Sequence, residues 1–297
     1  MIDSDSNGHS SSKVIAVAQG RRRTPLSFIV LAILFIVVPF LTWYLTWFGR
    51  SLSDDSITSY LNDAQNVRHV QQALTQIEER IEKGDQNVKR WYPKIVELST
   101  SNVTEIRKTV AWVMGQDNKA EEFHTALQKL LQDQQPIVRR NAAVQLVRFG
   151  DASGREELRA ILRPYSVVAP MEGTITSVLK EGGDAREGVL LARITNSQNQ
   201  TQELRSPLPG KIINVSAREG SKINAGDEVL KIAPDSDFVY EALRALFLVG
   251  QADDLPDVER YAQGVEGMPD QVKQQAAQTA KAIRSRSEDK NLSNVKQ

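Results

Sequence analysis

The chain contains two rough copies of one motif. Residues 167–194 read VVAPMEGTITSVLKEGGDAREGVLLARI, and residues 204–232 read LRSPLPGKIINVSAREGSKINAGDEVLKI. Each copy opens with Pro-x-x-Gly, continues through an alternating apolar run, and reaches Glu-Gly, a third glycine and a closing apolar run. Short alternating runs interrupted by glycine at fixed offsets are typical of β-strands joined by tight turns. The matched glycines, which we interpret as structural turns, are Gly173, Gly182 and Gly188 in the first copy and Gly210, Gly220 and Gly226 in the second.

A single copy of this motif is too small to bury its own apolar face. We therefore expect the two copies to interlock around a pseudo-twofold axis and to form one β-module over residues 166–234. Valine in place of Gly173 or Gly210 should damage this module if the turns at those positions need a positive φ.

At these residues the chain resembles the barrel-sandwich hybrid fold of biotinyl and lipoyl carrier domains. The same fold serves as the lipoyl module of membrane fusion (periplasmic adaptor) proteins. The residues that match are Val168 to Gly173, Glu181-Gly182, Gly188, Ser206 to Gly210, Glu219-Gly220 and Ala225 to Asp227.

The resemblance implies a covalent carrier or an adaptor module, and the chain departs from both patterns. Carrier domains present a lysine for biotin or lipoate on the turn between their halves, but the matching turn, residues 195–203, contains no lysine. We therefore expect no cofactor. Adaptors usually split the hybrid with a long helical hairpin, whereas only the nine residues 195–203 join the two copies here.

Composition excludes several classes of function. Lys plus Arg and Asp plus Glu both number 37 among 297 residues, so the net charge gives no argument for a nucleic-acid partner. Cysteine is absent, which rules out disulfides, thiolate metal sites and cysteine nucleophiles. The length predicts roughly two domains.

Residues 25–49 are predicted to form a transmembrane helix. Leu26 to Phe48 are nearly uncharged, and at about 1.5 Å per residue they match a hydrocarbon layer of about 30 Å. A cleaved signal peptide is the alternative, but the apolar stretch is long and no small-x-small site follows it. The residues that set the predicted orientation are Arg21, Arg22 and Arg23 before the span and Trp43 and Trp47 near its far end.

The positive-inside rule then places the N-terminus in the cytoplasm and the bulk of the chain in the periplasm. The chain would be a single-pass protein of the inner (cytoplasmic) membrane. Residues 1–24 are polar and are predicted to be a disordered cytoplasmic tail.

Residues 57–163 and 236–286 have the apolar period of amphipathic helices. An apolar frame of the type Val-Arg-x-x-Ala recurs with spacings of 32 and 33 residues, which resembles HEAT repeats, each a pair of antiparallel helices. We expect the β-module to be inserted in, or to cap, a short helical solenoid; an unrelated helical bundle on either side is the alternative. Residues 287–297 are predicted to be a disordered tail. The frame begins at Ile106, Val138, Val239 and Val272, and a fainter copy begins at Val67.

No residues have the spacing of a catalytic or metal site. The histidines, His9, His69 and His124, lack the spacing of a triad or a ligand set. Asp253-Asp254 could bind calcium, but no regular ligand loop surrounds the pair. We therefore expect neither an enzyme nor a metal site.

The predicted fold class is α+β and multidomain: a single transmembrane helix, α-helical HEAT-like repeats, and an all-β barrel-sandwich hybrid module inserted between helical segments. This organisation favours a non-enzymatic, membrane-anchored scaffold or adaptor, with an inner-membrane transporter or envelope complex as a candidate protein partner and self-association as an option. The alternatives are a periplasmic module that binds a glycan or small ligand and, third, a biotin or lipoate carrier. The candidate partner contacts are Glu181, Asp184, Arg186, Asn196, Gln198, Asn199, Gln200, Glu219 and Lys222.

Overall fold

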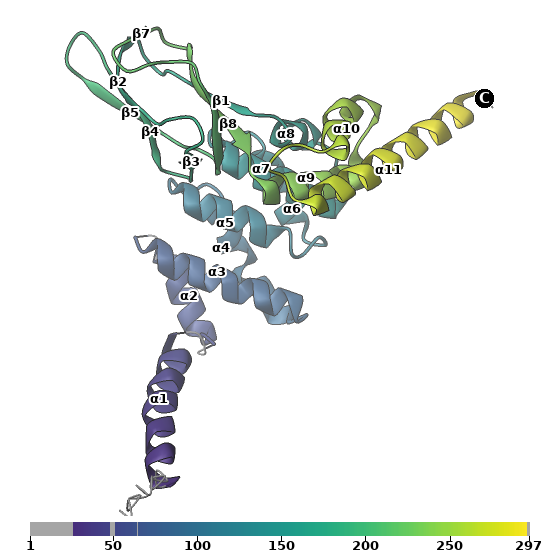
Figure 1. The fold of residues 1–297 in the computed structure, drawn as a ribbon. Helices are drawn as coiled ribbons and strands as arrows, with labels where there is room; N and C mark the ends of the chain where they lie inside the picture. Colours follow the sequence, from purple (N-terminus) through teal and green to yellow (C-terminus); the bar gives the residue numbers. More distant parts are fainter. Residues whose placement is uncertain (1–25, 48–50, 64, 296–297) are drawn as a thin grey trace, which may run out of the picture. The chain divides into compact units, whose positions relative to one another are not determined.

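Helices form most of the chain, and one β-module interrupts them (Figure 1). The computed structural model describes residues 26–47, 51–63 and 65–295. Internal contacts divide the chain into two units, Met1–Ser51 and Leu52–Gln297.

The first unit contains α1, Leu26–Trp47, a helix of 22 residues with Pro39 inside it. The side chains described on it, at residues 30–42, are exposed. The expected fold class included a transmembrane helix, and this prediction is wrong. Among the described residues, no helix is both long and apolar enough to cross a membrane.

Other predictions about this region fall outside the described residues. These are the tail 1–24 with Arg21, Arg22 and Arg23, and the side chains of Trp43 and Trp47.

The described helices of the second unit stack as pairs. The first helices are α2 (Asp54–Asn62), α4 (Tyr92–Leu98), α6 (Glu121–Leu130), α8 (Arg155–Ile161) and α10 (Leu255–Gln263). The second helices are α3 (Val67–Glu82), α5 (Thr104–Met114), α7 (Pro136–Leu146), α9 (Ser236–Val249) and α11 (Asp270–Val295). Short 3-10 segments are η1 (Gln86–Trp91), η2 (Val147–Phe149) and η3 (Ala252–Asp254).

Each second helix contacts the next one: α3 packs on α5, α5 on α7, α7 on α9 and α9 on α11 (Figure 1). We call this series the second-helix row. The apolar frame lies in the first turn of every helix in the row. Val138 and Val239 are 101 residues apart, but without the 70 residues of Tyr165–Pro234 the spacing would be 31, close to the 32 residues from Ile106 to Val138 and the 33 from Val239 to Val272.

One apolar core holds the helices on both sides of the module together. It includes Leu158 and Ile161 of α8 and Val239 and Leu243 of α9. The module is therefore an insertion between the two helices of the fourth pair, and the helical array continues across it. At the other end of the array, α11 runs to Val295 and so includes most of residues 287–297, which the sequence predicts to be a tail.

The module consists of two four-stranded antiparallel sheets with strand orders β1-β8-β6-β3 and β5-β4-β2-β7. Exchanging the first four strands with the last four converts one order into the other, so the two copies interlock with pseudo-twofold symmetry. The strands are β1 (Tyr165–Val168), β2 (Gly173–Val178), β3 (Asp184–Ala185), β4 (Leu190–Thr195), β5 (Thr201–Arg205), β6 (Gly210–Val215), β7 (Lys222–Ile223) and β8 (Glu228–Pro234).

The strand register is also the same in the two copies. β2 pairs with β4 around a bulge at Thr176, and β6 pairs with β8 around a bulge at the matching Ile213. The turns of each copy bond to the other copy: the Gly182 N–H donates to the Ile212 carbonyl at 2.8 Å, and the Gly220 N–H donates to the Ile175 carbonyl at 2.8 Å.

The matched glycines serve two different needs. Gly182, with φ +82°, has open space around an added Cβ, so the turn conformation alone calls for glycine there. Gly173 is not at positive φ, which corrects the reason expected from the sequence. A Cβ at Gly173 would instead lie 2.6 Å from the Thr195 carbonyl oxygen. Gly210 combines the two needs: its φ is +156°, and an added Cβ would lie 2.1 Å from the Ala233 carbonyl oxygen.

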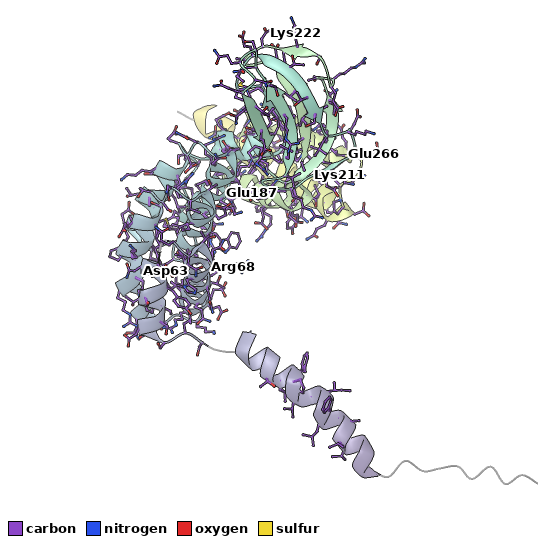
Figure 2. The ribbon with its side chains drawn as sticks, turned by 90° about the vertical axis from the view of Figure 1, so that its left-hand side faces the viewer. Asp63, Arg68, Glu187, Lys211, Lys222 and Glu266 are labelled. Carbon is purple, nitrogen blue, oxygen red and sulfur yellow. The ribbon has the colours of Figure 1, made fainter. Side chains whose placement is uncertain are left out.

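The two ends of the module have different surroundings. At the attached end, Leu208 is 1% exposed within the helical core, and Lys108 Nζ of α5 lies 2.6 Å from Glu187 Oε2. At the opposite, free end lie the β4–β5 hairpin and Lys222; Figure 2 shows Lys222 far from the helices and Glu187 beside them. Met171, the counterpart of Leu208, packs only on the module's own core.

Candidate functional site

The candidate contacts predicted on the module do not form one surface. Lys222 pairs with Thr174, and Thr174 pairs in turn with Thr195 at the base of the β4–β5 hairpin, so Lys222 and the hairpin share the free end. Asp184 instead pairs with Lys211 at the edge of the other sheet. The predicted residues that are exposed at these turns are Glu181, Asp184, Arg186, Gln198, Asn199, Gln200, Glu219 and Lys222.

The Asn/Gln-rich hairpin uses its amides to hold its own shape. Asn196 Oδ1 accepts from the backbone N–H groups of Gln198 at 3.0 Å and Gln200 at 2.9 Å, and Asn196 Nδ2 donates to Gln200 Oε1 at 2.9 Å. Asn199 has a left-handed φ of 63°, which asparagine tolerates better than most residues. The composition that suggested a ligand surface is therefore accounted for by turn geometry.

The histidines of the helical array lie beside carboxylates. His69 Nδ1 is 2.7 Å from Asp63 Oδ2, and His124 Nε2 is 2.8 Å from Asp151 Oδ2. The hydrogen bond to Asp151 raises the pKa of His124. Burial alone would raise the pKa of Asp151, but hydrogen bonds from Ser153 and other donors, His124 among them, outweigh it and lower the pKa to about 2. Among the described residues, no group of three or more histidine, aspartate or glutamate side chains could hold a metal ion.

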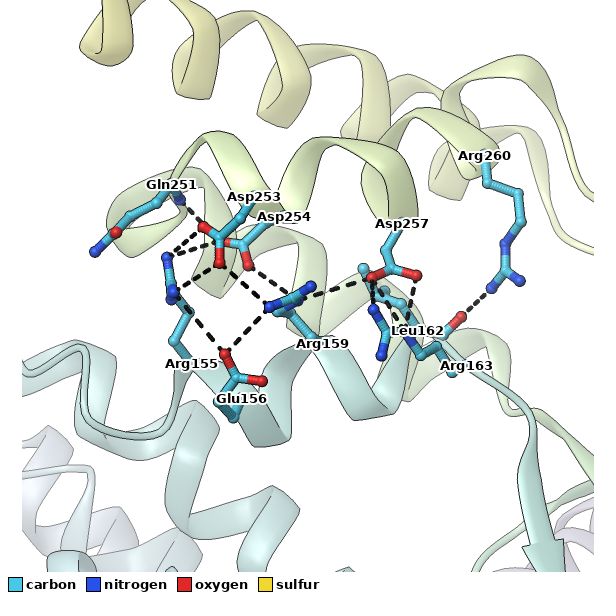
Figure 3. A network of polar contacts seen from close by, with 10 residues as sticks. All are labelled: Arg155, Glu156, Arg159, Leu162, Arg163, Gln251, Asp253, Asp254, Asp257 and Arg260. Carbon is cyan, nitrogen blue, oxygen red and sulfur yellow. Dashed lines mark hydrogen bonds and ion pairs between the residues drawn. The ribbon is translucent and has the colours of Figure 1, made fainter.

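Asp253 and Asp254 bind arginines, as Figure 3 shows. Arg155 Nη1 lies 2.8 Å from Asp253 Oδ1, and Arg159 Nε lies 3.3 Å from Asp254 Oδ1. Burial raises the pKa of Asp254, against the opposing effect of the hydrogen bond from the Gln251 N–H. These contacts join α8, which precedes the module in the sequence, to η3 at the start of α10, which follows it.

A groove of about 610 Å³ follows the second-helix row. Trp112 of α5 is 40% exposed and Leu248 of α9 is 61% exposed, so the groove presents large apolar side chains to solvent. We call it the row groove. Its lining residues are Trp112, Val144, Gln145, Val147, Arg148, Glu241, Arg244, Ala245, Phe247, Leu248, Gln275 and Gln278.

Polar groups fix the walls of the row groove. Trp112 Nε1 donates to Glu78 Oε1 of α3 at 2.6 Å, which holds the indole in one orientation. Arg244 Nη1 lies 3.0 Å from Glu241 Oε1 one turn earlier on α9, so these two charges are paired. Arg148 differs, because its Nη1 donates to a neutral acceptor, Gln116 Oε1, at 2.9 Å.

The row groove was not visible in the sequence, because each helix contributes only a few residues to it. Trp112 and the stretch Phe247-Leu248 read as ordinary members of amphipathic helices. The one usable signal was that both fall on the frame-bearing helices, near the end of the helix opposite to the frame.

Comparison with known proteins adds little to this picture. No protein-family model matches the chain, and no curated protein matches it. One solved structure, a single-chain, multi-domain long-chain acyl-CoA carboxylase, is similar over 48% of this chain and 16% of that chain, at 22% identity and a TM-score of 0.23. This likeness is too weak to support an argument about fold or function.

Proposed function

We propose that this chain is a non-enzymatic scaffold that binds a segment of a protein partner in the row groove. The observation behind this proposal is the groove itself, with Trp112 exposed on α5 and Phe247 and Leu248 exposed on α9, the helices on either side of α7 in the row. Exposed apolar side chains gathered in one place mark interaction sites more often than isolated ones do.

The architecture supports a binding role over a catalytic one. Stacked helical repeats form extended surfaces for protein partners. Tryptophan and arginine, which are enriched among residues that dominate binding energy, both line the row groove, as Trp112 and Arg148. Trp112 lies on α5 and is held by its hydrogen bond to Glu78, so this side chain loses little conformational entropy when a partner binds.

The β-module would add a second, rigid contact surface. Its resemblance to carrier and adaptor modules supports a docking role, and its β4–β5 hairpin lacks the lysine that covalent carriage needs. The free end projects away from the helices (Figure 2), so a partner held in the row groove and one held at the free end would not compete for the same side chains.

Site-specific photocrosslinking tests the proposal. A benzoylphenylalanine at Phe247, in the full-length chain and its native cells, should yield a discrete protein adduct. The variant Leu248→Asp should abolish that adduct, because it places a charge on the apolar wall. A crosslinker at Val168, which is 48% exposed on β1 outside the groove, is the matched control. Adducts at Phe247 that survive Leu248→Asp unchanged would overturn the proposal.

A further inference from the structure

The row groove has an uncompensated positive charge. Among the described residues, no carboxylate lies in ion-pair contact with Arg148, whereas the other charged groups that line the groove, Glu241 and Arg244, pair with each other. An arginine fork binds a carboxylate through two parallel hydrogen bonds. The charge pattern of the groove therefore complements an acidic group.

The floor of the groove holds an unsatisfied polar group. Gln145 is 1% exposed, and its carboxamide oxygen has no hydrogen-bond partner among the described residues. This oxygen lies against Gly115, where an added Cβ would be 2.0 Å away. The oxygen is enclosed there, so Gln145 closes the floor of the groove, and recognition of an occupant depends on Arg148 and the apolar walls.

From the unpaired charge of Arg148 and the exposed Trp112 and Leu248, and resting on the proposed function, we infer that the row groove binds an acidic–apolar peptide segment of the partner. Its apolar side chain would pack between Trp112 and Leu248, and its Asp or Glu would pair with Arg148. Recognition by one charged residue beside an apolar anchor gives specificity at small interface size.

Selection from a random 12-residue peptide library displayed on phage, against the full-length chain, tests this inference. Enriched peptides should combine a large apolar residue with Asp or Glu. Selection against Arg148→Glu should replace the acidic preference by Lys or Arg. Arg148 is exposed, so this substitution should leave the fold intact. Arg68→Glu, the same change of charge at an exposed position of α3 outside the groove, should keep the acidic preference.

Affinity measurements then sharpen the result. A selected acidic peptide, labelled with fluorescein, should bind Arg148→Glu on the order of tenfold more weakly than the wild-type chain.

Two outcomes separate this inference from the proposed function. If the Phe247 adduct depends on Leu248 but the selected peptides show no acidic preference, or none are enriched, the inference fails while the scaffold role stands. If the adduct does not depend on Leu248, both fail. A preference that persists in Arg148→Glu also overturns the inference, because the carboxylate would then bind elsewhere.

Discussion

The two ends of the β-module are built by the same strand order and register, yet one is buried against helices and the other is free. Leu208 at the attached end enters the helical core, while its counterpart Met171 at the free end touches only the module. The duplicated glycines therefore determine the internal fold of the module, and a few side chains at one end determine where it is attached.

The largest expected effect on stability comes from Gly173 and Gly210, which occupy matching positions in the two copies. In Gly210→Val, a Cβ would lie 2.1 Å from the Ala233 carbonyl oxygen, and in Gly173→Val 2.6 Å from that of Thr195. We expect each to lower the free energy of unfolding by about 3 kcal/mol or more. Gly182→Ala, which has open space but φ +82°, should cost only about 1 kcal/mol. Urea denaturation of the full chain measures all three, and equal losses would contradict the two-class explanation.

The second prediction separates the ends. Leu208→Ala should cost about 3 kcal/mol, because it opens a cavity in a buried core. Met171→Ala, at a half-buried position, should cost about 1 kcal/mol. Hydrogen exchange should show faster exchange in α5 and α7 for Leu208→Ala only. Equal losses for both variants would mean that the attached end contributes no more to stability than the free end.

Much of this fold is predictable from sequence because its constraints are local and repeated. The glycine spacing follows from turns that recur in each copy, and the apolar frame recurs in the first turn of each second helix. The insertion is visible as well, since the interval between Val138 and Val239 exceeds the repeat by about the length of the module.

The candidate site could not be predicted in the same way, because it depends on residues that are far apart in the chain. Trp112, Arg148 and Leu248 come together only when the helices stack. The arginine–aspartate contacts likewise join residues more than 90 positions apart, although Arg155 and Arg159 form a visible stripe on α8. The Asn/Gln composition of the β4–β5 hairpin suggested a ligand surface, but Asn196 accepts a hydrogen bond from within its own turn.

The third prediction tests the arginine–aspartate contacts that join α8 to η3, which we call the helical clamp. Asp254 is fully buried, accepts the Gln251 N–H at 2.7 Å and lies near Arg155 and Arg159. Asp254→Ala should cost about 2 kcal/mol, because it removes the capping hydrogen bond to the Gln251 N–H and the carboxylate that pairs with Arg155 and Arg159. Hydrogen exchange should accelerate in α8 and α10 and remain unchanged in β2 and β4. Faster exchange throughout the module would show that the clamp stabilises the insertion itself.

The smallest expected effect is a pH dependence that belongs to the helical array and not to the module. Because the pKa of His124 is raised in the fold, its bond to Asp151 stabilises the protein fully below the unfolded pKa of about 6.5, and this contribution is lost as pH rises through the folded value. The free energy of unfolding should therefore fall as the pH rises above about 6.5, by no more than about 1 kcal/mol.

His124→Gln should abolish this fall, and Leu208→Ala should leave it intact, since the two sites share no contact. The Asp151 carboxylate contributes in the opposite range: its folded pKa of about 2 means that its stabilisation is present above the unfolded value and is lost as pH falls toward 2. Urea denaturation across this pH range checks both slopes. If the free energy of unfolding of His124→Gln still falls at high pH, another group causes the fall, and the pH dependence no longer distinguishes the helical array from the module.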